Sequence, residues 1–160
     1  MDEAGTAADT ARHRPFAIDA NNAVWSSLAL DERTDDDVDE MLERAYAAAH
    51  HWRLATEPGA IERARAAWLI SRVHAVAGQA ELAARFAERC RVLVAAAGDG
   101  AADFDHAYAE EATARALACA GDLAGAAEAR RRAASIDIAD DEDREIVESD
   151  LADGPWYGLS

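Results

Sequence analysis

A pair of glycines, Gly78 and Gly121, constrains the fold of this chain more than any other sequence feature. Each glycine interrupts an alanine-rich segment, and small residues coincide when the two segments are aligned on it. The coinciding residues are Ser71 and Ala114, seven positions before the glycine, and Ala83 and Ala126, five positions after it. Small residues let two helices cross closely, and glycine readily adopts the positive φ that ends a helix. The sequence therefore predicts two similar helical hairpins, one turning at each glycine.

The other segments of the chain also have helical periodicity, so the predicted fold class is all-α. Alanine dominates a composition that is 51% hydrophobic but only 6% aromatic. Alanine has the highest helix propensity, and the sequence has no alternating β-branched runs of the kind typical of strands. We expect about seven helices in antiparallel hairpins, over residues 17–29, 35–56, 60–77, 80–97, 103–121, 123–135 and 141–152.

The first two predicted helices have recognisable local signals. Thr34 and Asp37 have the spacing of a capping box, which predicts that the second helix begins just after Thr34. In the first helix, steps of three and four residues define one face that we expect to be buried. The residues on that face are Ile18, Asn22, Trp25 and Leu28.

A single domain is predicted between two tails. Residues 1–14 are small, polar and aperiodic, so we expect them to be a disordered N-terminal tail. Residues 15–153 carry the helical periodicity and suit one helical-repeat domain, because about 140 residues can bury a core. Residues 154–160 contain two glycines and a proline, and we expect them to leave the fold as a C-terminal tail.

The charge of the chain narrows the range of partners. It has 32 acidic and 16 basic residues, for a formal net charge of −16. The 16 basic residues are all arginine, and the chain has no lysine. Such a chain repels phosphate backbones, so we expect no nucleic-acid partner. No apolar run approaches the roughly 20 residues of a membrane span, and the first residues lack the order of a signal peptide. We therefore expect a cytoplasmic protein without a membrane partner.

The two aligned segments, Ser71 to Ala83 and Ala114 to Ala126, resemble the tetratricopeptide repeat. That resemblance implies a right-handed array of helical hairpins, an αα superhelix, although a compact bundle is an alternative. The period of 43 residues exceeds the usual ~34 residues, and Glu110 and Thr113 stand where the family has large apolar residues. The chain is also similar to a set of bacterial tetratricopeptide-like proteins. That similarity rests on His51-Trp52, Ala67 to Arg72, Arg89-Cys90 and Asp103 to Asp105.

The resemblance also implies which residues face a partner, because the first helix of each repeat lines the concave surface. The implied residues are Arg65, Trp68 and Arg72 in one hairpin and Tyr108, Glu111 and Arg115 in the next. Two equivalent arginines beside aromatic rings suit an acidic peptide or a C-terminal carboxylate. In the alternative interpretation, Arg72 and Arg115 pair with Glu111 and neighbouring acids, and Trp68 belongs to the core.

A second hypothesis places a pocket between the N-terminal helices and the repeat. Its residues would be Asn22, Trp25, His51 and Trp52, with Arg65 close by. A metal site is not expected there, because the adjacent His50 and His51 point about 100° apart on a helix. The sequence also contains no GxSxG, no HExxH and no phosphate-binding glycine loop. We therefore expect no catalytic residues, no metal and no cofactor.

The function predicted from these patterns is a protein- or peptide-binding scaffold or adaptor without catalytic activity. One alternative is a small-molecule sensor or enzyme that uses the second pocket. Another is a structural homodimer formed through an apolar hairpin face. A closed cavity with converging polar groups would favour the first alternative over an open groove.

Overall fold

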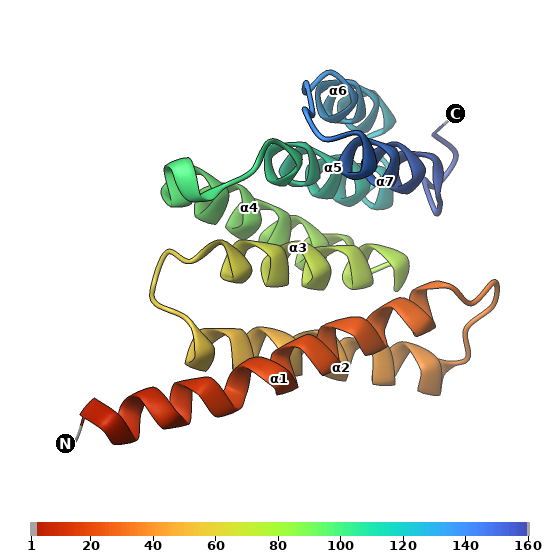
Figure 1. Ribbon diagram of the computed structural model, residues 1–160. Helices are drawn as coiled ribbons and strands as arrows, with labels where there is room; N and C mark the ends of the chain where they lie inside the picture. Colours follow the sequence, from red (N-terminus) through yellow and green to blue (C-terminus); the bar gives the residue numbers. More distant parts are fainter. Residues whose placement is uncertain (1–2, 160) are drawn as a thin grey trace.

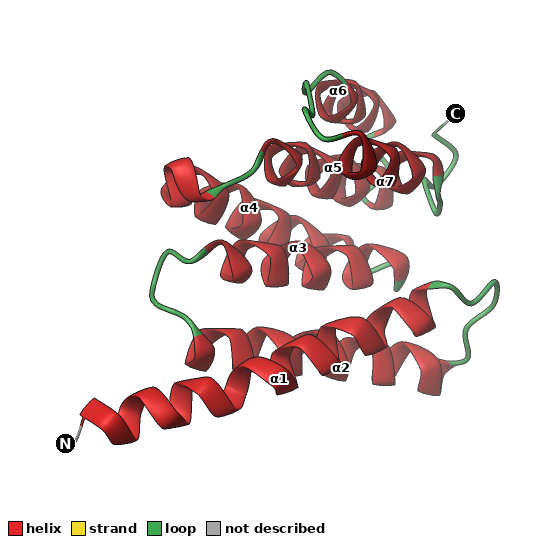
Figure 2. Cartoon of the chain, viewed as in Figure 1, coloured by secondary structure: helices red, strands yellow, loops and turns green. Residues whose placement is uncertain are grey.

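The computed structural model describes residues 3–159, which form seven α-helices and one short 3-10 helix and contain no strand (Figures 1 and 2). The prediction of an all-α fold is confirmed. None of the helices within that range is long and apolar enough to cross a membrane. The helices are α1 (Glu3–Leu28), α2 (Asp35–Ala55), α3 (Ile61–Val76), α4 (Ala80–Ala97), η1 (Gly98–Gly100), α5 (Asp103–Cys119), α6 (Leu123–Ala134) and α7 (Asp141–Ala152).

Consecutive helices pack as pairs, α1 with α2, α3 with α4 and α5 with α6. The pairs are stacked in chain order from the bottom to the top of Figure 1. Between the pairs, α3 packs on α5, and α7 packs on α5 in front of it. The helix α1 lies mainly against α2 and meets α3 over a short stretch. As a result α1, α3, α5 and α7 border one region of the molecule.

The two glycine turns have the same hydrogen-bonding pattern. The φ angles of Gly78 and Gly121 are +74° and +85°, as the sequence predicts. Each glycine N–H, and the N–H after it, bonds back into the last turn of the preceding helix, over 2.9–3.1 Å. The pairs are Gly78 to Ala75, Gln79 to His74, Gly121 to Ala118 and Asp122 to Leu117. Where the helices cross, the Ser71 hydroxyl donates to the Ala83 carbonyl at 2.8 Å, which explains the small residues.

The capping box at the second helix is confirmed. The backbone N–H of Asp37 donates to the Thr34 hydroxyl at 3.2 Å, and the Thr34 N–H donates to the Asp37 carboxylate at 2.8 Å. The hydrogen bonds from Thr34 lower the pKa of the Asp37 carboxyl. Because this cap fixes the start of α2, it also fixes which residues of α2 point inward. Met41, Ala45 and Ala48 are buried, as the periodicity predicts.

The first helix differs from the prediction in its start and in its buried face. It begins at Glu3, so residues 3–14, expected to be disordered, are helical, whereas residues 1–2 lie outside the described residues. The segment is rich in alanine, and Arg14 reaches Glu62 of α3 at 3.4 Å. Between residues 10 and 28 the buried residues are Ala17, Val24 and Ser27, while the predicted Ile18, Asn22 and Trp25 are exposed. The buried face is thus rotated by one residue from the predicted one.

The segment after α7 is packed against the domain, in contrast to the free tail that the sequence predicts. The Trp156 ring is buried between two guanidinium groups, with the Arg115 carbon 4.3 Å and the Arg130 carbon 4.7 Å from its centroid. The Tyr157 hydroxyl donates to the Ala75 carbonyl at the end of α3. Cation–π contacts of this kind hold an aromatic ring firmly when they are desolvated. Residues 154–159 therefore complete the core around α5, α6 and α7.

Candidate functional site

A groove of about 210 Å³ opens where α1, α3, α5 and α7 come together, with α4 at its base. We call it the central groove. Its lining combines large apolar side chains with a few polar ones. The lining residues are Asn21, Trp25, Ala64, Arg65, Trp68, Cys90, Val94, Phe104, Asp105, Tyr108, Ile146 and Asp150.

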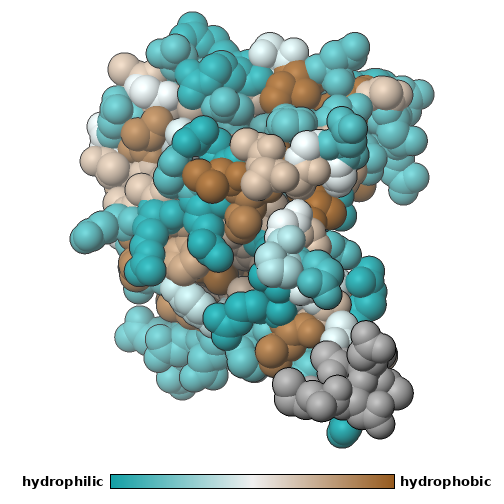
Figure 3. Space-filling model, turned by 90° about the vertical axis from the view of Figure 1, so that its left-hand side faces the viewer, coloured by the Kyte–Doolittle hydropathy of each residue, from teal (hydrophilic) through white to brown (hydrophobic). Residues whose placement is uncertain are grey.

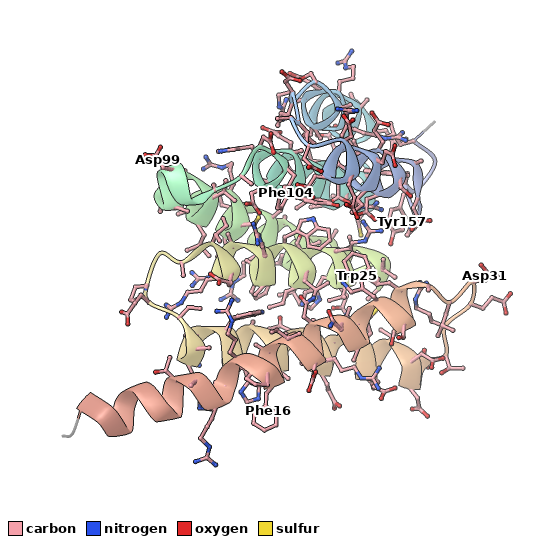
Figure 4. All side chains as sticks on the ribbon, in the orientation of Figure 1. Phe16, Trp25, Asp31, Asp99, Phe104 and Tyr157 are labelled. Atoms are coloured by element: carbon pink, nitrogen blue, oxygen red, sulfur yellow. The ribbon has the colours of Figure 1, made fainter. Side chains whose placement is uncertain are left out.

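Aromatic rings from three helices form the walls of the central groove. The Trp68 ring lies 4.7 Å from the Tyr108 ring and 5.7 Å from the Trp25 ring, measured between centroids. Phe104 meets Tyr108 edge-on at 6.4 Å. In Figure 4, Trp25 points from α1 towards α3, and Phe104 lies at the start of α5. Ring pairs at these distances restrain each other, so the walls are set before any ligand arrives.

A buried charge network lies beside the groove and is centred on Glu111. One carboxylate oxygen of Glu111 accepts from the Trp68 indole N–H at 2.7 Å. The other accepts from Arg72 at 3.1 Å and from Arg115. The two guanidinium groups also contact Asp150 of α7 and Asp153, which directly follows α7. Arg72 pairs with the carboxylates of these two residues, and Arg115 donates to their backbone carbonyls. The network therefore joins α3 to α5 and both helices to α7.

Two further polar contacts stand at the edge of the groove. Arg65 donates two hydrogen bonds, of 2.8 and 3.0 Å, to the buried Asp105 carboxylate, and this bonding raises the pKa of Arg65. The Tyr108 hydroxyl donates to the Asp150 carboxylate at 2.7 Å. Burial, followed by the bond to Asp150 and its charge, raises the pKa of Tyr108. At neutral pH the Tyr108 hydroxyl therefore keeps its proton and its bond to α7.

The six residues implied by the tetratricopeptide resemblance are all gathered in this one region. They divide into two groups. Arg65, Trp68 and Tyr108 line the groove, whereas Arg72, Glu111 and Arg115 are only 2%, 0% and 1% exposed. The contacts agree with the alternative interpretation, since both arginines pair with Glu111, Arg72 also pairs with Asp150 and Asp153, and Trp68 is part of the core. The arginines are therefore already neutralised and do not wait for a ligand carboxylate.

The second predicted set of residues is not brought together. Trp25 lines the central groove, but Asn22 is exposed, and its neighbour Asn21 lines the groove instead. His51 and Trp52 lie at the other end of α1 and α2. There the His51 ring is 5.1 Å from the ring of His13, and the Arg14 guanidinium stacks over Trp52 at 5.2 Å. The predicted pocket between these four residues does not form.

Three histidines gather at that end of the molecule. The Nδ1 atoms of His13 and His51 are 2.9 Å apart, and the ring of His50 is 5.5 Å from that of His51. Partial burial, followed by the charges of His13 and His50, lowers the pKa of His51. Across residues 3–159, no His, Cys, Asp and Glu side chains form a group of three or more able to hold a metal ion.

Several residues of the central groove were not predicted from the sequence. Phe104, Ile146 and Asp150 belong to α5 and α7, and none of them was predicted to line a site. A weak signal was available, because Phe104 precedes Tyr108 by four residues and Ile146 precedes Asp150 by four. Each pair therefore occupies one stripe of its helix. What the spacing alone does not reveal is that the two stripes face each other.

The ionisable groups of the central groove are buried or already paired. Its one thiol, Cys90, is buried, and that burial, with the charges of Asp105 and Glu111, raises the pKa of Cys90 to about 12. Because the thiolate is the nucleophilic form, Cys90 is inert at neutral pH. The polar groups at the edge, Arg65 and Tyr108, are held by carboxylates of the protein itself. The groove thus offers an aromatic surface with fixed polar edges.

Comparison with protein-family models, with curated proteins and with solved structures finds no significant match to this chain. Its function is therefore inferred from the central groove and the residues around it.

Proposed function

We propose that the chain is a tetratricopeptide-like module that binds a peptide segment of a partner protein, with an apolar or aromatic side chain seated in the central groove. The observation that carries this proposal is the groove itself, an aromatic recess whose rim leaves large apolar side chains in solvent. Trp25 is 37% exposed and Ile146 is 50% exposed. Exposed apolar residues around a recess are typical of a surface that a partner covers.

The size of the groove suits one inserted side chain. Its volume of about 210 Å³ lies below the ~300–1,000 Å³ usual for pockets that enclose a drug-sized ligand. A single leucine, phenylalanine or tryptophan of a peptide fits such a recess, while the rest of the peptide lies across the rim. Anchors of that kind dominate many protein interfaces.

The scaffold around the groove supports the same proposal. The helices α3 and α5, which begin the two repeated hairpins, supply most of the aromatic and polar lining. In the tetratricopeptide family the first helices of the repeats form the binding surface. The matching turns at Gly78 and Gly121 strengthen the likeness to that family.

Charge defines the chemistry of the partner. Four carboxylates stand at or beside the groove, on Asp105, Glu111, Asp150 and Asp153, against the three guanidinium groups of Arg65, Arg72 and Arg115. The local balance is therefore negative, within a chain of net charge −16. A peptide with basic residues beside its apolar anchor is the complement of this surface. An acidic peptide or a C-terminal carboxylate would meet repulsion there.

A structural homodimer is the alternative that also uses exposed apolar residues. On the face shown in Figure 3, hydrophobic residues gather near the middle, and hydrophilic residues interrupt and surround them. Obligate dimers bury wider and more continuous apolar surfaces. Light scattering of the purified protein separates the two cases, because a peptide-binding monomer keeps the mass of one chain.

The test is a selection of random peptides displayed on phage against the purified chain. We expect the enriched peptides to share an aromatic or aliphatic anchor flanked by lysine or arginine. Ile146→Asp places a charge at the groove rim and should weaken binding about tenfold or more. Val92→Asp is the matched control, because Val92 is equally exposed, at 50%, on α4 and lines no part of the groove.

Intrinsic fluorescence provides a second readout, because Trp25 and Trp68 lie in the groove. A bound anchor should change their emission in the Val92→Asp protein and much less in the Ile146→Asp protein. Binding should also weaken as salt is added, because part of the attraction is electrostatic. Enrichment of acidic peptides, or equal binding by the two variants, would contradict the proposal.

A further inference from the structure

A second recess lies between α2, α3 and α4 and shares no lining residue with the central groove. Its volume is about 280 Å³. We call it the basic cleft. Its walls come from α2 and α4, and its floor is a small-residue stretch of α3. The lining residues are Tyr46, Ala49, His50, Arg53, Arg63, Ala66, Ala67, Ile70, Phe86 and Arg89.

The charge of the basic cleft is opposite to that of the chain. Acidic residues outnumber basic ones by 32 to 16 overall, yet the lining contains three arginines and a histidine and no carboxylate. Within residues 3–159, Arg53, Arg63 and Arg89 take part in no ion pair. The arginines of the central groove, in contrast, are neutralised by nearby acids. Positive charge is therefore concentrated in the basic cleft, and no acidic residue of its lining balances it.

Arg63 is held in place before any ligand arrives. Its Nε donates to the Thr56 hydroxyl at 3.2 Å, and its Nη2 donates to the Arg53 carbonyl at 2.8 Å and to the Thr56 carbonyl. These bonds cap the C-terminal end of α2 and occupy the edge of the guanidinium group formed by Nε and Nη2. A guanidinium has five N–H donors, so Nη1 keeps its hydrogens for another acceptor.

Arg53 and His50 are also linked. Arg53 Nη2 lies 3.2 Å from His50 Nδ1, and because a guanidinium can only donate, the imidazole nitrogen is the acceptor. In the tautomer that this bond requires, His50 carries a hydrogen on Nε2, which is a further donor. Arg89 extends from α4 on the other wall and completes a set of donors on both sides of the cleft.

One side of the basic cleft is aromatic. The Tyr46 and Phe86 rings meet edge-on, with centroids 5.7 Å apart, and join α2 to α4. The buried side chains of Ile70, Ala66 and Ala67 form the floor. A ligand with a flat apolar body can lie against this wall while its charged group meets the arginines.

We propose that the basic cleft binds a small organic anion, a phosphate or carboxylate carried on an aromatic or aliphatic body. Guanidinium forks recognise both anions through paired hydrogen bonds, and the apolar wall adds contact area that an inorganic ion cannot use. The site goes beyond the proposed peptide groove, because it has different lining residues and the opposite charge. The helix α3 lies between the two sites and contributes residues to each.

The experiment is a thermal-unfolding titration with phenyl phosphate, inorganic phosphate, benzoate and benzyl alcohol. A ligand that binds the native state raises Tm, by about 3–6 °C for a chain of this size at about ten times its Kd. We expect phenyl phosphate and benzoate to raise Tm, inorganic phosphate to raise it less, and benzyl alcohol to leave it unchanged. The comparison of phenyl phosphate with benzoate distinguishes the two anions.

Arg89→Glu and Arg53→Glu are the test variants, and Arg131→Glu is the matched control. All three side chains are exposed, and Arg131 makes no ion pair with the described residues and lies on α6, away from the cleft. Each substitution changes the net charge equally, so a general effect of charge would appear in all three. We expect the Tm shift to be lost in the two cleft variants and kept in Arg131→Glu. Circular dichroism verifies that each variant is folded.

A second readout is the broadening of the phenyl phosphate phosphorus resonance when protein is added. It should follow the Tm shift across the variants. The proposal is overturned if no organic anion raises Tm, if Arg131→Glu removes the effect as fully as Arg89→Glu, or if only an acidic polymer such as polyglutamate binds. The peptide proposal is tested separately, because Ile146→Asp leaves the basic cleft intact.

Discussion

In the first repeated hairpin, α3 carries Trp68 and Arg72, and at the equivalent positions of the second hairpin α5 carries Glu111 and Arg115. The turns that follow are alike in φ and in hydrogen bonding. The side chains differ in a complementary way, since Trp68 donates to Glu111 and both arginines share that carboxylate. The different side chains of the two hairpins therefore make a contact between them that two identical hairpins could not make.

The largest expected effect comes from Glu111→Gln, which removes the negative charge that the two hairpins share. The buried Arg72 and Arg115 would lose their common counter-charge, and we expect the free energy of unfolding to fall by about 3–5 kcal/mol. Urea denaturation measures this change. Glu110→Gln is the matched control, because the neighbouring carboxylate pairs with Arg132 at the surface and should contribute less than about 1 kcal/mol. Equal losses in the two variants would show that the network does not join the hairpins.

The second largest expected effect concerns the glycine turn that the two hairpins have in common. Gly78→Ala and Gly121→Ala each place a side chain on a residue with positive φ, and we expect each to lower the free energy of unfolding by about 1–2 kcal/mol. No atom lies within 4 Å of the methyl group that alanine would place at either position, so the loss would be conformational. Gly100→Ala is the control, because its φ is not positive and the same space is open. Unequal losses at the two turns would mean that the copies differ in backbone as well as in side chains.

A smaller effect is expected at another pair of equivalent positions, Arg65 and Tyr108. Both side chains end on a carboxylate, Arg65 on Asp105 and Tyr108 on Asp150 of α7. Tyr108→Phe should lower the free energy of unfolding by about 1 kcal/mol, because one hydrogen bond is lost. A double-mutant cycle with Asp150→Ala measures the coupling directly. A coupling near zero would show that α7 is held by the arginines alone.

The parts of this picture that the sequence predicts are the local ones. The glycines that follow alanine-rich helices predict the positive φ of Gly78 and Gly121. The tetratricopeptide resemblance, aligned on these glycines, selects the six residues from Arg65 to Arg115 that lie in one region. Pairing of the two arginines with Glu111 could be predicted, but the ion pairs of Arg72 with Asp150 and Asp153 could not, because these acids are remote in the chain and reach the network only where α7 packs on α5. The helical residues 3–14 were missed for a similar reason, since His13 and Arg14 contact α2 and α3, which are remote in the chain.

The smallest effect concerns His74, which stands where the second hairpin has Leu117. Its Nδ1–H donates to the Gln79 side-chain oxygen at 2.5 Å, and its Nε2 accepts from the Tyr46 hydroxyl at 2.8 Å. Burial lowers the pKa of His74, and the bond to Gln79 opposes part of that shift. The folded state therefore favours the neutral ring, and protonation would break the bond from Tyr46.

The sign of the pH dependence follows from that lowered pKa. The unfolded chain takes up the proton near its ordinary pKa of about 6.5, before the folded chain does, so stability is full above that value and is lost as the pH falls. His51 acts in the same direction. We expect His74→Leu, which makes the first hairpin resemble the second, to reduce the difference in urea midpoint between about pH 7.5 and about pH 5.5 without abolishing it. If the difference is unchanged, His74 is not a source of the pH dependence, and the two hairpins respond to acid alike.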